Sequence, residues 1–260
     1  MMRNQYVLWP DMVLFYGAMP KEIARHHHPV IQLIIGTEKP FLKKAPDGSW
    51  QSCRSLLVAP NVTHECDAAE QKIFSLSIDP ESELGAFLIQ NDLADRDQLQ
   101  FTETALDYFD FERVEELIRS EAYHELYHYC LAFFQPDGVP PVHAEKEERI
   151  ETVKHYIKEH LDQRITSSTL CELVFLSESR LLHLFKQEMG LPIRNYILWV
   201  RLTKALEMIL AGESLTRAAH DAGFFDSSHM SRTFVRQLGI NPAEIVKNSK
   251  FIQVSVLEQA

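Results

Sequence analysis

The feature that most constrains this chain is a repeat in its C-terminal half. Residues 177–190 and residues 226–239 share one pattern of serine, apolar and glycine positions, offset by 49 residues. A proline follows each copy closely, at Pro192 and at Pro242. Duplicated helical units of this size are typical of proteins that read DNA. The matched positions are Ser179 and Ser228, Leu181 and Met230, Phe185 and Phe234, and Gly190 and Gly239.

Within each copy, the spacing predicts a helix that buries one face and exposes the side chains near its N-terminal end. Each copy places two large apolar residues four positions apart, so both face a core. A helix that docks in the major groove reads base edges with its exposed N-terminal side chains. The candidate base-reading residues are Ser179, Arg180, Leu182 and His183 in the first copy, and Ser227, Ser228, His229 and Arg232 in the second.

Helical patterns surround both copies and predict an all-α domain from 148 to 248. Ser167 or Ser168 and Ser177 are the expected N-caps of two short helices, and Gly212 is expected to end a long central helix. At ~1.5 Å per residue, that central helix can hold the reading helices about one DNA turn, ~34 Å, apart. The expected helices after the first apolar stripe cover about 167–174, 178–188, 193–211, 215–221 and 227–237.

Together these residues resemble the DNA-binding domain of the AraC/XylS family of transcription regulators. The resemblance covers about residues 148–247. It implies sequence-specific binding of double-stranded DNA, activation or repression of promoters, RNA polymerase as a candidate partner, and a homodimer. The motifs that carry it are Leu176-Ser177-Glu178-Ser179, Leu184-Phe185-Lys186, Arg201-Leu202-Thr203-Lys204-Ala205, Ala222-Gly223-Phe224 and Gly239-Ile240-Asn241-Pro242.

The resemblance also implies a set of cations that contact the DNA backbone. For Arg201 a second interpretation is equally open, in which the guanidinium pairs with an acid inside the domain and holds the two units together. The chain departs from the family pattern at His183 and Val235, and both departures remove a cation that could contact DNA. The candidate phosphate-contacting residues are Lys186, Arg194, Arg201 and Arg236.

The N-terminal half has a different pattern of apolar residues. Residues 1–80 contain short alternating apolar stretches separated by turn formers, which predicts a β-sandwich or small barrel. The family resemblance implies that this region is a cupin-like domain that senses an effector. Residues 81–134 are expected to be helical, with an apolar stripe over 111–134 that either packs on its own domain or forms a dimer seam. Residues 135–147, rich in proline, form the expected linker. The sequence therefore predicts an α+β protein with an all-α C-terminal domain.

Histidines in the β-rich half resemble the metal-binding motif of cupins. His26 and His28 form a His-x-His pair, Gln32 follows where cupins carry a carboxylate, and His64 follows a later proline. These four residues are the candidate lining of an effector pocket. Imidazole ligands suit a first-row divalent metal, with His26, His28 and His64 as the ligands. The favoured interpretation is a pocket without metal, and no cofactor is predicted.

Charge and composition narrow the class of protein. The net charge is −11, and residues 1–147 hold 12 Lys and Arg against 24 Asp and Glu. Residues 148–248 hold 13 basic against 12 acidic residues, so the acidity belongs to the N-terminal half and electrostatic attraction to DNA should be modest. No apolar run is long enough to span a bilayer, and the N-terminus does not resemble a secretory signal. We therefore expect a cytoplasmic regulator that is not an enzyme and has no membrane partner.

Two other functions remain open on the sequence. A metal-dependent cupin enzyme with a helical tail would account for the histidines. An anti-regulator that binds a protein with the same fold would account for the acidic N-terminal half and the missing cations.

Overall fold

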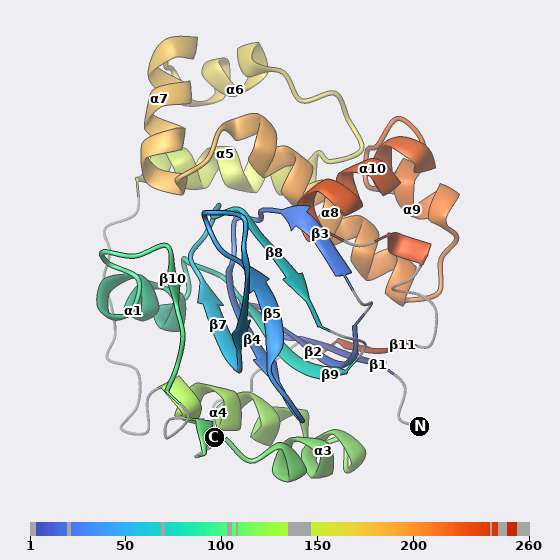
Figure 1. The fold of residues 1–260 in the computed structure, drawn as a ribbon. Helices are drawn as coiled ribbons and strands as arrows, with labels where there is room; N and C mark the ends of the chain where they lie inside the picture. The colour runs from blue at the N-terminus through green and yellow to red at the C-terminus, as the bar shows by residue number, and fades with distance from the viewer. Residues whose placement is uncertain are drawn as a thin grey trace. The chain divides into compact units, whose positions relative to one another are not determined.

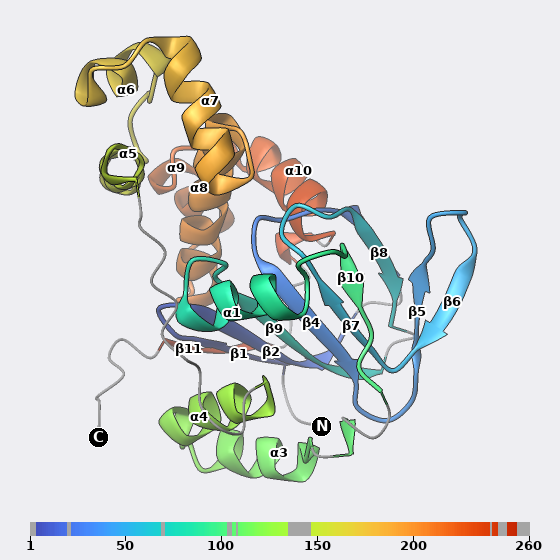
Figure 2. The same cartoon turned by 90° about the vertical axis from the view of Figure 1, so that its left-hand side faces the viewer.

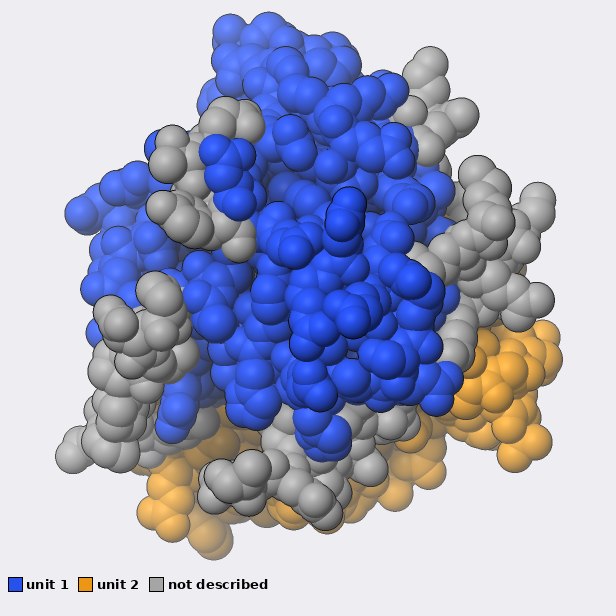
Figure 3. All heavy atoms as spheres, turned by 90° about the horizontal axis from the view of Figure 1, so that it is seen from below, with its two compact units in different colours: residues 1–25, 30–142, 248–260 blue, residues 26–29, 143–247 orange. Residues whose placement is uncertain are grey.

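A computed structural model describes residues 4–19, 22–68, 71–102, 106–107, 109–134, 147–239, 241–243 and 249–253. The chain divides into two compact units, coloured separately in Figure 3. One unit comprises residues 1–25, 30–142 and 248–260, and the other comprises residues 26–29 and 143–247. Most of the expected linker lies outside the described residues. None of the described helices is long and apolar enough to cross a membrane.

The first unit is built on a seven-stranded sheet with the strand order β10-β7-β4-β9-β2-β1-β11. Its central strands are buried along almost their whole length, and Leu14, Leu33, Leu57 and Leu76 are completely inaccessible to solvent. The pairs β2–β9 and β4–β9 are antiparallel. The strands are β1 (Asn4–Leu8), β2 (Met12–Ala18), β4 (Ile31–Gly36), β7 (Ser55–Val58), β9 (Lys72–Ile78), β10 (Gln98–Leu99) and β11 (Ser249–Gln253).

A second sheet has four strands in the order β3-β8-β5-β6. These strands are β3 (Glu22–His26), β5 (Phe41–Lys44), β6 (Trp50–Cys53) and β8 (His64–Asp67). The turn before β6 forms where the sequence places Pro46-Asp47-Gly48, and Gly48 adopts a positive φ of 83°. The backbone nitrogen of Ser49 donates to Asp47 Oδ1 at 2.9 Å, which closes this turn. The two-sheet N-terminal region confirms the expected β-rich architecture.

Strand β11 was not anticipated from the sequence. It pairs in parallel with β1, with Asn4 opposite Ser249 and Leu8 opposite Gln253. Ile252 packs against the core of the first unit. The chain therefore returns, after the helical unit, to complete the sheet in which it started. A parallel partner so distant in sequence leaves no local pattern by which it could be predicted.

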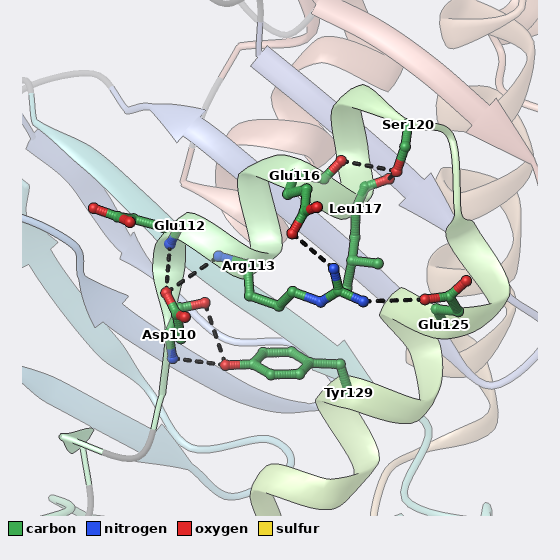
Figure 4. Close-up of polar contacts among 8 residues, drawn as sticks. All are labelled: Asp110, Glu112, Arg113, Glu116, Leu117, Ser120, Glu125 and Tyr129. Carbon is green, nitrogen blue, oxygen red and sulfur yellow. Dashed lines mark hydrogen bonds and ion pairs between the residues drawn. The ribbon is translucent and has the colours of Figure 1, made fainter.

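The expected helix over 111–134 is two helices, α3 (Phe111–Arg119) and α4 (Tyr123–Phe134), which lie side by side in Figures 1 and 2. The break falls at Glu121, whose φ is 58°. Before it, the Ser120 hydroxyl donates to the carbonyl of Glu116 at 2.9 Å, as Figure 4 shows. The interpretation of one continuous helix was therefore wrong. Helix α1 (Glu83–Asn91) and strand β10 precede this pair, so residues 81–102 are only partly helical.

The apolar stripe of α3 and α4 is buried inside its own unit. Val114, Leu117, Leu126 and Cys130 belong to the same core as the central strands, and all are at most 2% exposed. Across the outer face, Arg113 pairs with Glu116 at 2.7 Å (Figure 4). Solvent screens such exposed ion pairs, so burial of the stripe holds the helices in place. These side chains therefore pack on their own unit, while Ala122, Tyr129 and Phe133 of the same stripe are half-buried.

The second unit is all-helical. Its helices are α5 (Glu148–Glu159), α6 (Ser167–Val174), α7 (Glu178–Met189), α8 (Ile193–Leu210), α9 (Leu215–Asp221) and α10 (Ser227–Leu238). In Figures 1 and 2, α5, α6 and α7 gather at one end of α8, while α9 and α10 lie toward its other end. The N-cap of α6 is Thr166, whose hydroxyl accepts from Thr169 N at 3.2 Å, rather than Ser167 or Ser168.

Candidate DNA-binding surface

The two expected reading helices are α7 and α10, and their ends are fixed by equivalent residues. Ser177 caps α7 by accepting from Arg180 N at 3.4 Å, and Asp226 caps α10 by accepting from His229 N at 2.6 Å. Both helices end on a glycine in the left-handed region, Gly190 with φ 68° and Gly239 with φ 72°. A glycine adopts this conformation without the steric cost that a Cβ imposes.

The repeated apolar positions form the cores of the two helix-turn-helix units. Phe185 and Phe234 are fully buried, as are Leu181 and Met230 one turn earlier. This burial fixes which face of each helix points outward. The side chains between the apolar positions are therefore directed away from the core.

All four candidate reading residues of α7 are exposed. Ser179, Arg180 and His183 offer hydrogen-bonding groups, and Leu182, 41% exposed, offers an apolar contact of the kind that suits a thymine methyl group. This helix can therefore present both polar and apolar contacts to a groove.

Helix α10 exposes fewer of its candidate base-reading residues. Ser228 and Arg232 are exposed, whereas Ser227 and His229 are half-buried. The His229 ring packs edge-on against Phe224, with centroids 5.4 Å apart, and its Nδ1 is buried with no hydrogen-bond partner among the described residues. His229 is thus directed partly into its own unit.

Three of the four candidate phosphate-contacting residues have side chains exposed to solvent. Lys186, Arg194 and Arg236 are exposed. Arg201 differs because it is half-buried, and its Nη2 donates to the backbone carbonyl of Gln163 at 3.0 Å. Burial lowers the pKa of the Arg201 guanidinium. Its described hydrogen bond goes to a carbonyl rather than to the acid that the sequence interpretation expected.

Two exposed aromatic residues were not singled out from the sequence. Phe175 is 94% exposed and Phe225 is 92% exposed, and each stands just before the N-cap of a reading helix. Phe175 also has a positive φ of 53°, which is strained for a bulky residue. The sequence shows only a phenylalanine one or two residues before each N-cap, and neither its exposure nor its φ follows from that pattern.

The candidate pocket histidines of the N-terminal half are all buried. His26 is 5%, His28 is 2% and His64 is 4% exposed. His64 Nε2 lies 3.0 Å from Gln32 Oε1, and its Nδ1 lies 3.0 Å from the carbonyl of Val62. This donor set fits a first-row divalent ion in chemistry.

Comparison with protein families identifies the C-terminal helices. Residues 170–248 match the model of a helix-turn-helix domain. The chain is 34% identical over 100 residues to the probable transcriptional regulator LumQ of Photobacterium leiognathi, a match covering 37% of this chain and 40% of that protein. It is 31% identical over 98 residues to the transcriptional activator RhaS of Enterobacter sp. (strain 638), covering 37% of this chain and 35% of that protein. The matched segment thus spans less than half of these relatives.

Comparison with solved structures covers nearly the whole chain. The structure of ToxT from Vibrio cholerae O395 superimposes with a TM-score of 0.60 at 11% sequence identity, over 92% of this chain and 98% of ToxT. A structure of ToxT from V. cholerae strain SCE256 with a bound unsaturated fatty acid gives a TM-score of 0.55 at 11% identity, over 95% and 98% of the two chains. Residues 170–248 are therefore a helix-turn-helix domain of the AraC type, carried in one chain with an N-terminal two-sheet unit, as in the fold of ToxT.

Proposed function

We propose that this chain is a DNA-binding transcriptional regulator that reads two neighbouring segments of one duplex with α7 and α10. The observation that carries the proposal is the pair of capped helices, each with a buried phenylalanine and an exposed polar face. Exposed cations beside these faces supply the contacts that position a protein on the DNA backbone.

The proposal is tested by binding of the full chain to duplexes selected from a random library, measured by fluorescence anisotropy. We expect a preferred sequence, bound at least about a thousandfold more tightly than unrelated DNA, and a loss of affinity as salt rises. Folded protein that binds all duplexes equally, or none at any salt concentration, would overturn the proposal.

Regulation through the N-terminal unit is the second part of the proposal. Its two-sheet architecture is that of ToxT, of which one structure holds an unsaturated fatty acid. A small-molecule effector of this chain would bind the N-terminal unit and change DNA affinity. Adding unsaturated fatty acids should raise the thermal midpoint of the full chain and shift its DNA affinity. If neither the midpoint nor the affinity changed, this effector class would be excluded.

A homodimer and contact with RNA polymerase are proposed from the same family relationship. In this proposal the homodimer uses a surface other than the buried side chains of the α3–α4 apolar stripe. Light scattering of the purified chain should give twice the mass of one chain, and a mass of one chain at micromolar concentration would count against it. Transcription from a selected promoter with purified RNA polymerase separates an activator from a repressor.

The buried imidazoles of His26, His28 and His64 favour a second candidate, a metal-dependent cupin enzyme. Elemental analysis of the purified chain addresses it directly. One zinc, iron or manganese ion per chain, lost on His64→Ala, would support the enzyme. Metal-free protein that still selects a DNA sequence would exclude the metal-dependent enzyme.

A further inference from the structure

We infer that Arg201 and Gly223 are positioning residues that lock the two helix-turn-helix units together, so that the target duplex must hold its two read segments at one spacing. The inference rests on the proposed function for its DNA consequence. Its structural part concerns a junction between α5, α8 and the turn between α9 and α10, all within the helical unit.

Gly223 forms the tightest part of this junction. Its φ is 76°, a conformation that other residues rarely adopt. A Cβ at this position would lie 1.8 Å from the carbonyl oxygen of Leu161 and 2.9 Å from Arg201 Nε. Leu161 follows α5 and belongs to the first helix-turn-helix unit, whereas Gly223 precedes the reading helix of the second. The two helix-turn-helix units therefore touch backbone to backbone, and any side chain at position 223 would push these two helix-turn-helix units apart.

Arg201 closes the same junction from α8. Its Nη2 donates to the carbonyl of Gln163, two residues beyond Leu161, at 3.0 Å. Its Nε is buried with no hydrogen-bond partner among the described residues and faces Gly223. A guanidinium held between two segments of the protein is not free to follow a phosphate, unlike the exposed Arg194 on the first turn of the same helix.

The junction restricts the spacing between the two half-sites of the target duplex. A single connecting helix would leave each unit free to pivot about its own end. The Leu161–Gly223 contact adds a second connection, and two connections fix an orientation. Each base pair rotates B-DNA by roughly 35° and advances it by about 3.4 Å. A locked reader therefore accepts one spacing between its half-sites, whereas a pivoting reader accepts several.

The first test uses a duplex selected by the unmodified chain, with one base pair inserted or removed between the segments that α7 and α10 protect. The unmodified chain should lose at least about tenfold in affinity with either change. Arg201→Met and Gly223→Ala should both bind the original duplex more weakly and tolerate the changed spacing within about threefold. For Arg201→Met the salt slope should stay unchanged, because no phosphate contact is lost.

Arg194→Met is the matched control, because Arg194 is an exposed arginine on the same helix. It should lower the salt slope by about 1 and keep the strict spacing. If Arg201→Met behaved like this control, Arg201 would be a phosphate contact and the inference would be overturned. Strict spacing retained by both junction variants would also overturn it.

A second measurement needs no DNA and stays decisive if the chain proves not to bind any. Spin labels at Ser179→Cys and Ser228→Cys, both exposed, report the distance between the reading helices. Cys171, the half-buried cysteine, is replaced by alanine to limit labelling to these sites. We expect one narrow distance distribution, which broadens in Arg201→Met and in Gly223→Ala. An equally narrow distribution in both variants, or a broad one in the unmodified junction, would overturn the lock.

Discussion

The two helix-turn-helix units carry one sequence pattern in two environments. Both bury a phenylalanine completely, and both end their reading helices on a left-handed glycine. Around the turn they diverge, because Phe175 is 94% exposed whereas Phe224, at the equivalent repeat position, is 5% exposed. The turn before α10 packs against the first helix-turn-helix unit through Gly223, and it buries Phe224 while Phe225 stays 92% exposed. A repeated pattern therefore specifies the element, while its neighbours decide which side chains remain available for binding.

The largest expected effect tests the part that the two units share. Phe185→Ala and Phe234→Ala each remove a fully buried aromatic ring, and each should lower the free energy of unfolding by about 3–5 kcal/mol. Denaturant unfolding followed by circular dichroism measures this loss. A cost below about 1 kcal/mol for either one would show that its unit is loosely packed and that the two cores are not equivalent.

The next effect concerns the reading surfaces, where the units differ. Arg232→Ala should cost about 1–3 kcal/mol of binding free energy and relax the preference at one base pair, if Arg232 reads a guanine. His229→Ala should leave base preference almost unchanged, because the ring packs on Phe224. Anisotropy titrations against single-base variants of the selected duplex measure both. Loss of preference on His229→Ala with none on Arg232→Ala would reverse the assigned roles within α10.

The helix caps should also differ in strength. The Asp226 carboxylate accepts at 2.6 Å, whereas the Ser177 hydroxyl accepts at 3.4 Å. Charge-assisted hydrogen bonds are stronger than neutral ones, and a carboxylate is favoured at the positive end of a helix. Asp226→Ala should therefore cost about 1–2 kcal/mol of unfolding free energy, and Ser177→Ala about 0.5 kcal/mol. Equal costs, measured by thermal unfolding, would contradict this ranking.

Much of this arrangement could be predicted from the sequence, and the reasons are local. The helices α7 and α10 follow from apolar spacing, caps and C-terminal glycines, all of which act within one helix. The orientation of His229 could not be predicted, because it depends on Phe224 in the preceding turn. The role of Arg201 required the position of Gln163, 38 residues earlier in the chain. Strand β11 required a partner at the opposite end of the chain. Contacts between distant segments leave no periodic pattern.

The smallest expected effect concerns the exposed Phe175 in the turn before α7. Phe175 is held at φ 53°, and no burial compensates for this because its side chain is 94% exposed. Phe175→Gly should therefore raise the free energy of unfolding by up to about 1 kcal/mol, since glycine adopts this conformation without a steric cost. Phe175→Ala is the matched control, because it removes the ring and keeps the Cβ, and it should leave stability almost unchanged. If Phe175→Gly destabilised the chain as much as a core substitution, the ring would be packed in solution. The contrast between an exposed Phe175 and a buried Phe224 would then be wrong.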